Sequence, residues 1–385
     1  MIHFPRKSLA KQFIHDLSGK NPISDAPNGL FLAAPRRTGK SMFLRHDLVP
    51  EFAENGIVPI YVDLWEHRDE DPAVLIAGVI GRRAREERSL LQMARDSVRA
   101  SVNVGPVALE FDDSKIGKPG GISIPEALQR IHAATGKPVA LIVDEAQHAL
   151  TSTTGIDAMA SLKSARDQMN SPSEVNVILV MSGSDRDKLL RLVNSNAAPF
   201  YGSQITKMPT LGRDYIEALA EEVERLHKKA NPIDVDVLFH AFDLYGFRPQ
   251  FLGNGILAAL DATQGTTTFN EAILRQANET AAAAAEEMTS IFLGLSELQR
   301  ALLWRMFTEG GKFRPFDADA LKFYSKHTGA KVSVAQAQSA LEGLRNRDDP
   351  LVWKSARGEY SVNDSGMVRW FNSLNEAGKW PPAGP

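Results

Sequence analysis

The chain has 385 residues, a formal net charge of −3 and no cysteine, so disulfides and Cys-ligated zinc are excluded. Its length allows two or three domains with full cores, and its near-neutral charge gives no general attraction to nucleic acid or anionic lipid. No apolar stretch reaches membrane-spanning length, and Met1–Lys11 lacks the apolar core of a signal peptide. We therefore expect a cytoplasmic protein without a membrane partner.

The first distinctive segment, residues 29–41, is a short apolar run that leads into a loop of phosphate-binding type. Leu30–Ala33 is predicted to be a buried strand, and residues 34–41 follow the spacing G-x-x-x-x-G-K-[ST], with Ala34 in place of the first glycine. Alanine is disfavoured there if the turn needs a positive φ. The helix formers of Met42–Leu48 follow, and the N-terminus of such a helix favours anions.

In such a loop the backbone N–H groups hold the phosphate oxygens of a nucleotide. Gly39 allows close approach, Lys40 reaches the β and γ oxygens, and the Ser41 hydroxyl is a ligand for Mg²⁺. The predicted nucleotide-binding residues are Ala34, Pro35, Arg36, Arg37, Thr38, Gly39, Lys40, Ser41 and Met42. A chance Gly-Lys-Ser is the alternative, but it does not explain the preceding strand or the second motif downstream.

The chain between the two motifs alternates apolar runs with helical patterns. Val58–Leu64 is predicted to be a strand and Pro72–Arg88 a helix that follows an acidic turn. Gly105–Gly121 is rich in Gly, Pro and Asp and indicates an irregular or hairpin insertion. Ile124–Thr135 is predicted to be a helix.

The second motif is the uninterrupted apolar run Val139–Val143, followed by Asp144 and Glu145. A run without alternation is typical of a central strand covered on both faces. Open α/β sheets bind ligands at the carboxyl ends of their strands, so Asp144 is placed to hold Mg²⁺ and Glu145 to orient and deprotonate an attacking water. A solvated acidic turn is the alternative interpretation of the pair alone.

A helix at Ile156–Met169 and a strand at Val175–Met181, ending in Ser182, complete the alternation. The pattern predicts an α/β fold with a parallel sheet and helices on both faces. After Leu211 the strands stop: Tyr215–Ala230, Asp234–Tyr245 and Pro249–Thr263 are predicted to be three helices of a compact subdomain. Phe269–Ser290 is rich in Ala and Glu, which favours a connecting helix.

The C-terminal part has the order of a winged helix-turn-helix. Its predicted helices are Ser296–Glu309, Ala318–Thr328 and Val334–Arg347, and Leu351–Val362 alternates like a two-stranded wing with Arg357 at its tip. From Ser290 onward there are thirteen Lys and Arg against ten Asp and Glu, a balance of only +3. Five cations of this part are candidates for phosphate contacts: Lys331, Arg345, Arg347, Lys354 and Arg357. Solvated charges on a protein-binding or internally packed domain are the alternative.

With these elements in this order, the chain resembles the archaeal-type ATPases of the STAND group, relatives of the AAA+ proteins, over nearly its whole length. The segments that carry the resemblance are residues 34–41, 61–65, 141–146, 181–184, 199–202 and 360–364, with Trp370. The resemblance implies a P-loop NTPase core at 1–210, a helical lid at 211–268, a connecting helix at 269–290 and a winged-helix domain at 291–385. It also implies ATP and Mg²⁺ as cofactors.

The resemblance suggests roles for further residues. Ser182, with Ser184 beside it, stands where AAA+ proteins keep a sensor of the γ-phosphate, and Arg248 resembles the second sensor, which couples nucleotide state to the lid. A surface arginine at a helix start is the alternative for Arg248. The expected catalytic set is therefore Glu145, Lys40, Ser182 and Arg248, with Ser41 and Asp144 as metal ligands.

One position departs from the family. Many relatives carry an arginine directly after the Tyr-Gly pair, where this chain has Ser203. If that arginine completes a neighbouring active site, this protein lacks it there, although Arg186 and Arg191 lie nearby in sequence. An arginine finger is worth roughly 10³–10⁵ in rate, so we expect slow hydrolysis until a protein partner or a second copy completes the site.

Three functions fit these observations. The first is an ATP-driven molecular switch that couples nucleotide state to the lid and the winged helix. The second is a DNA-binding AAA+ helper ATPase of initiator or transposition type, whose turnover DNA would stimulate with a steep salt dependence. The third is a nucleotide-dependent scaffold, which Glu145 argues against because a pure binder needs no carboxylate there.

Overall fold

The computed structural model describes residues 4–21, 23–67, 69–99, 116–117, 121–184, 186–194, 198–230, 232–263, 267–354 and 359–382. Contacts divide the chain into two compact units. The sheet unit comprises residues 5–34 and 40–208, and the C-terminal unit comprises residues 35–39 and 209–385 together with Phe4.

The sheet unit is built on five parallel strands in the order β2-β3-β4-β1-β5. Their bounds are β1 Leu30–Ala33, β2 Val58–Asp63, β3 Val139–Asp144, β4 Val177–Gly183 and β5 Ile205–Lys207. Every residue of β1, β3 and β4 is buried, as the uninterrupted apolar runs predict for central strands. Because β4 lies between β1 and β3, the end of β1 and the acidic end of β3 both adjoin the end of β4.

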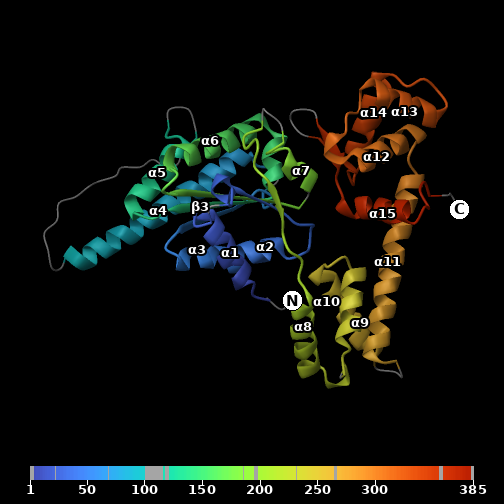
Figure 1. Cartoon of the computed structure of the whole chain (residues 1–385), viewed down its shortest axis with the longest axis horizontal. Coiled ribbons are helices and arrows are strands. Elements are labelled where there is room, and N and C mark those ends of the chain that lie inside the picture. The colour runs from blue at the N-terminus through green and yellow to red at the C-terminus, as the bar shows by residue number, and fades with distance from the viewer. Residues whose placement is uncertain are drawn as a thin grey trace. The chain divides into compact units, whose positions relative to one another are not determined.

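Helices cover both faces of this sheet (Figure 1). One face packs on α1 Lys7–Leu17, α2 Lys40–Phe43, the π-helical turns Leu44–Leu48 and α3 Val49–Glu54. The other face is covered by α4 Pro72–Arg99, α5 Ile124–Thr135 and α6 Thr153–Met169, while α7 Arg186–Leu190 follows β4. Alternate residues of one strand serve the two layers: Ala140 and Ile142 lie in the α1–α3 core, so their neighbours face the other side.

The structure extends the sequence-based prediction of this unit in three places. Helix α4 runs to Arg99, beyond the predicted end at Arg88, and most of the expected insertion at 105–121 lies outside the described residues. Strand β5 was not predicted because three half-exposed residues give no periodic signal. Helix α1 was also missed, although Ala10, Phe13, Ile14 and Leu17 are buried at helical spacing.

The C-terminal unit begins with helices α8 Arg213–Leu226, α9 Val235–Leu244 and α10 Pro249–Ala262, which share one core with the start of α11 Phe269–Leu293. The alanine-rich middle of α11, residues 282–287, is exposed, while Phe292 near its end enters a second core. Helix α11 therefore contributes residues to two apolar cores, one near each of its ends.

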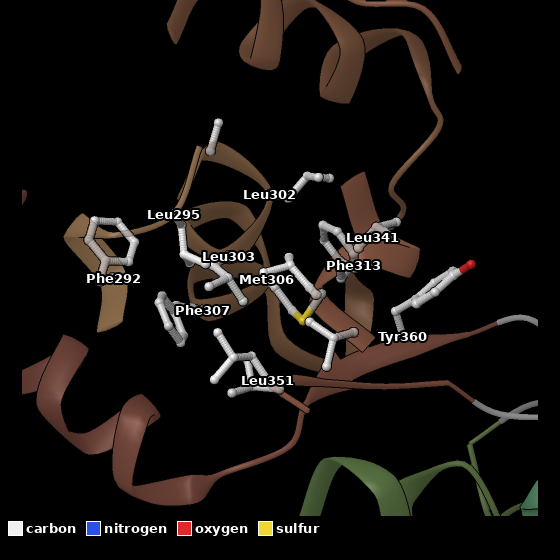
Figure 2. Packing of buried hydrophobic residues seen from close by; sticks show 14 of the residues in the cluster. Phe292, Leu295, Leu302, Leu303, Met306, Phe307, Phe313, Leu341, Leu351 and Tyr360 are labelled. Carbon is white, nitrogen blue, oxygen red and sulfur yellow. The ribbon is translucent and has the colours of Figure 1, made fainter. Parts of the chain in front are cut away.

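The second core is formed by helices α12 Glu297–Glu309, α13 Ala318–Thr328, α14 Val334–Arg345 and α15 Ser365–Glu376 with the antiparallel strands β6 Val352–Lys354 and β7 Tyr360–Val362. Figure 2 shows Leu303, Met306 and Phe307 of α12 pointing among Leu351 and other apolar side chains. The expected wing tip, Arg357, lies outside the described residues. Helix α15 was not predicted, but Met367, Trp370 and Phe371 bury one face of it.

Candidate functional site

The carboxylate of Asp144, at the end of β3, is the centre of a buried polar network. Its Oδ1 atom accepts hydrogen bonds from the Lys40 ammonium, from the Ser182 hydroxyl and, at 2.9 Å, from the backbone N–H of Glu145. Lys40 also lies 3.2 Å from the Ser182 hydroxyl. The order of the strands explains this meeting, since β4, which contains Ser182, lies between β1 and β3.

The other oxygen of the same carboxylate faces two hydroxyl groups. Asp144 Oδ2 accepts a hydrogen bond from Ser41 Oγ at 2.6 Å and another from Tyr61 Oη at 2.9 Å. Tyr61 comes from β2, which pairs with β3 in register, and the Arg45 guanidinium lies over its ring at 4.8 Å. Arg45 also forms an ion pair of 3.0 Å with Asp63 at the end of β2.

These contacts keep Asp144 charged. Burial alone would raise the pKa of its carboxyl, but the Lys40 ammonium and the hydrogen bonds from Lys40, Ser182 and Ser41 outweigh burial and lower this pKa to about 2. Burial would lower the pKa of Lys40, whereas the two adjacent carboxylates raise it. The network therefore places one buried ammonium between two carboxylates, and each carboxylate is stabilised by this cation and by hydrogen bonds.

Glu145 begins where β3 ends, with a left-handed backbone at φ 54° that is uncommon for a non-glycine residue. Its Oε1 lies 3.0 Å from the Lys40 ammonium. Its Oε2 accepts hydrogen bonds from Ser184 Oγ at 2.7 Å and from Gln147 Nε2 at 2.5 Å. Burial raises the pKa of Glu145, but the Lys40 charge and the Ser184 hydrogen bond lower it overall, so this side chain is an ionised acceptor at neutral pH.

Gln147 is a residue of the site that the sequence did not single out. It is 2% exposed, and its Oε1 has no hydrogen-bond partner among the described residues. A Cβ added to Gly183 would lie 2.6 Å from this oxygen, so a larger residue at position 183 would displace the Gln147 amide. Tyr61 was noted for its place in a family-like segment, but no pattern along the chain connects it with Asp144. The sequence offered one indication for Gln147, namely a polar residue two positions after the acidic end of a predicted strand.

The loop residues divide between the two units. Ala34, Lys40, Ser41 and Met42 belong to the sheet unit, and Pro35–Gly39 belongs to the C-terminal unit. Positive φ angles in the loop fall on Arg37 and Gly39 and not on Ala34. Ala34 N donates to Gly183 O at 3.0 Å and so continues the pairing of β1 with β4.

Alanine is therefore accommodated at the position of the usual first glycine because the backbone there does not take a positive φ. Thr38 is buried and donates to Pro35 O at 2.6 Å, whereas Arg36, Arg37 and Met42 are exposed. The side chains of Lys40 and Ser41 thus donate hydrogen bonds to Asp144. The side chains of Arg36, Arg37 and Met42, all in the described part of the chain, form no hydrogen bond with this carboxylate and are exposed.

The remaining predicted residues lie elsewhere in the fold. Arg248 belongs to the C-terminal unit, where it is the half-buried residue before α10. Arg186 begins α7, Arg191 follows its end, and Ser203 follows the exposed Tyr201.

The described donors suit a hard divalent cation. Ser41 Oγ and Asp144 Oδ2 are 2.6 Å apart and both are oxygen atoms, the ligand type that Mg²⁺ prefers. Such an ion is usually bound by one or two protein groups together with phosphates and waters, so the small size of this donor set is consistent with it. No group of three or more His, Cys, Asp or Glu suited to a metal occurs in the described part of the chain.

Comparisons with solved structures identify the fold. The structure of the Aeropyrum pernix ORC2 protein in its ADP form matches with a TM-score of 0.50 and 13% identity, over 97% of this chain and 93% of that one. A second structure of that protein, with ADPNP and ADP, gives 0.48 and 12% over 98% and 96%. Cdc6p from Pyrobaculum aerophilum gives 0.43 and 14% over 98% and 96%.

No family model matches the sequence, and no curated protein matches it. The fold prediction is confirmed: the chain has an AAA+-like P-loop NTPase fold with a parallel sheet. In the described ranges, no helix combines the length and apolar character needed to cross a membrane.

Proposed function

We propose that the protein binds ATP with Mg²⁺ and hydrolyses it, and that it acts as a molecular switch. The observation that carries the proposal is the meeting of Lys40, Ser41, Asp144 and Glu145 at the carboxyl edge of the parallel sheet. In an open α/β sheet this edge is the ligand-binding edge, and the four side chains are those that phosphoryl transfer to water requires.

Each side chain has a distinct task in this proposal. Lys40 neutralises phosphate oxygens, and Ser41 with Asp144 would hold Mg²⁺, which bridges phosphate oxygens and offsets their charge. Glu145 accepts a hydrogen bond from the attacking water, and Ser184 and Gln147 fix the orientation of its carboxylate. The Ser182 hydroxyl is hydrogen-bonded to both Lys40 and Asp144. We therefore propose that Ser182 orients these two side chains and does not itself contact the γ-phosphate.

The output would pass through the C-terminal unit. We propose residues 211–268 as a lid, 269–290 as a connecting helix and 291–385 as a winged-helix domain of STAND type. Arg248, in front of α10, is the proposed second sensor. Since Ser203 occupies the usual finger position, we propose that a second copy or a protein partner completes the site.

The test is steady-state ATP hydrolysis over a range of protein concentrations. Glu145→Gln should abolish turnover while ATP binding persists, and the exposed Glu174→Gln serves as the matched control in the same unit. Turnover that rises faster than linearly with concentration would support a shared site. Equal turnover in the wild type and Glu145→Gln would refute the proposed catalytic role.

A second candidate is a DNA-binding helper ATPase, favoured by the three-helix and two-strand order of the C-terminal region. Two of its candidate phosphate contacts, Arg345 and Lys354, form ion pairs with Glu342 on α14 at 2.8 and 3.0 Å. Because these pairs reduce the positive charge offered by that surface, the switch is the preferred function. Stimulation of hydrolysis by duplex DNA, declining steeply with salt, would reverse this preference.

A further inference from the structure

Tyr61 contacts the candidate site from one end of the sheet. Strand β2 is the first in the described strand order, and it pairs with β3 so that Tyr61 lies opposite Ile142, two residues before Asp144. The Tyr61 hydroxyl oxygen lies 2.9 Å from Asp144 Oδ2. A tyrosine hydroxyl is protonated at neutral pH, whereas an ionised carboxylate can only accept. Tyr61 is therefore the donor in this hydrogen bond.

The two carboxylate oxygens of Asp144 have different surroundings. Oδ1 accepts three hydrogen bonds, from two side chains and one backbone N–H, and these occupy its lone pairs, of which an oxygen of this kind has about two. Oδ2 accepts from Ser41 and from Tyr61. Since Ser41 is itself a proposed ligand of Mg²⁺, Tyr61 is the donor to Oδ2 that is not a proposed metal ligand.

The ring of Tyr61 is held in place by a neighbouring ion pair. Arg45 Cζ lies 4.8 Å from the centroid of this ring, within the usual range for a cation–π contact. Arg45 pairs with Asp63 at 3.0 Å, and Asp63 Oδ1 accepts the backbone N–H of Trp65 at 2.9 Å. Arg45 lies four residues after Ser41. The helical segment that carries Ser41 therefore also supplies the cation that packs on Tyr61.

We propose that Tyr61 is a positioning residue for the divalent cation that Ser41 and Asp144 would hold. This inference rests on the proposed function, because it assumes that metal site. A metal-binding carboxylate is oriented by hydrogen bonds from neighbouring groups, and loss of such a partner typically lowers metal affinity 10- to 100-fold. Mg²⁺ takes few protein ligands, so the orientation of each one matters. Removal of the Tyr61 hydroxyl should weaken binding of the cation and leave binding of the metal-free nucleotide unchanged.

The experiment measures Mn²⁺ binding by electron paramagnetic resonance, because Mn²⁺ shares with Mg²⁺ the preference for oxygen ligands in octahedral geometry. Mn²⁺ is titrated into the full-length protein mixed with a smaller amount of ADP, and the free ion is quantified. Tyr61→Phe should raise the dissociation constant of Mn²⁺ about tenfold or more. Tyr201→Phe, which removes an exposed hydroxyl from the same unit, should change it less than about twofold.

Two further measurements separate positioning from a purely structural role. Arg45→Met removes the cation that packs on the ring but keeps the hydroxyl, so it should weaken Mn²⁺ binding by only about two- to fivefold, as expected for an exposed cation–π contact. Calorimetric titration with ADP in the presence of EDTA should give the wild-type affinity for Tyr61→Phe. A role in folding alone would change the two titrations to the same extent.

The outcomes distinguish this inference from the proposed function. If Tyr61→Phe has wild-type circular dichroism and wild-type Mn²⁺ affinity, or if it loses Mn²⁺ and metal-free ADP binding equally, the inference is overturned and the proposed function stands. A wild-type protein that binds ADP but no Mn²⁺ would refute the proposed metal site and this inference with it. None of these measurements depends on hydrolysis, so a slow ATPase does not affect them.

Discussion

Charged side chains gather in two regions of the molecule, at the carboxyl edge of the sheet and before helix α10, and the two regions differ in how neighbouring groups affect these charges. At the carboxyl edge of the sheet, the Lys40 ammonium is buried against Asp144 and Glu145, and each carboxylate also accepts hydrogen bonds from neutral donors. In the C-terminal unit, the charges of Arg37 and Arg369 oppose that of Arg248, and the carboxylate of Asp364 is the group that favours it. In the first region, a cation and hydrogen-bond donors of the protein stabilise each buried carboxylate, whereas in the second the like charges of neighbouring arginines oppose one another.

This contrast shows that burial and a shifted pKa do not by themselves tell whether the charge of a group is stabilised by its surroundings. Both regions contain shifted groups, but the shift of Asp144 records stabilisation of its charge and the shift of Arg248 records its destabilisation. Both pKa values are lowered, but a lowered pKa means that the charged form is favoured for an acid and disfavoured for a base. Four experiments test this difference between the two regions.

The largest effect is expected from removing the cation at the carboxyl edge of the sheet. Lys40→Met leaves two buried carboxylates facing each other, and breaking a buried pair costs about 3–5 kcal/mol. Urea denaturation should show this loss in the free energy of unfolding. The double variant Lys40→Met, Asp144→Asn should recover part of it, because it removes one uncompensated charge; no recovery would mean that the network is not coupled in this way.

The second-largest effect is expected from acid, which should lower the free energy of unfolding by protonating Asp144 in the same region. The pKa of Asp144 is lowered in the folded state from 3.8 to about 2, so the folded protein binds this proton less readily than the unfolded chain. The associated stability, on the order of 2 kcal/mol, is fully present above pH 4 and is lost as the pH falls toward 2. Denaturation between pH 5 and 2 measures this slope, which Asp144→Asn should reduce.

Removing a single neutral donor should have a smaller effect. Tyr61→Phe deletes the hydrogen bond to Asp144 Oδ2 but leaves Ser41 on that oxygen, so a loss of about 1 kcal/mol is expected. Thermal denaturation of this variant, with Tyr201→Phe as the exposed control, tests it. A wild-type melting temperature would show that the Tyr61 hydroxyl does not support the carboxylate.

The smallest effect should have the opposite sign. Arg369→Gln removes one of the like charges that oppose Arg248, so at low salt it should stabilise the protein by a few tenths of a kcal/mol. The gain should fade as salt rises from 0.02 to about 0.5 M, since exposed charges are screened. A loss of stability at low salt would mean that Arg369 is compensated like Lys40.

Much of the site could be predicted because its chemistry is concentrated in two short segments. Lys40 and Ser41 follow an apolar strand in a fixed spacing, and Asp144 and Glu145 end another, so parallel pairing alone brings them to the same edge. Neighbouring functional residues lack this local signal. Tyr61 is an ordinary strand residue until β2 pairs in register with β3, and Gln147 becomes part of the site through the turn that Glu145 begins.

Local patterns in the sequence predict the kinds of elements, since periodicity and turn residues act over a few positions: Ile124–Thr135 and Ala318–Thr328 are helices at the predicted bounds. The order β2-β3-β4-β1-β5, which brings Ser182 within hydrogen-bond distance of Lys40 and Asp144, depends on tertiary packing. Pairings between residues more than a hundred positions apart depend on how whole layers pack, and no local pattern along the chain encodes that packing.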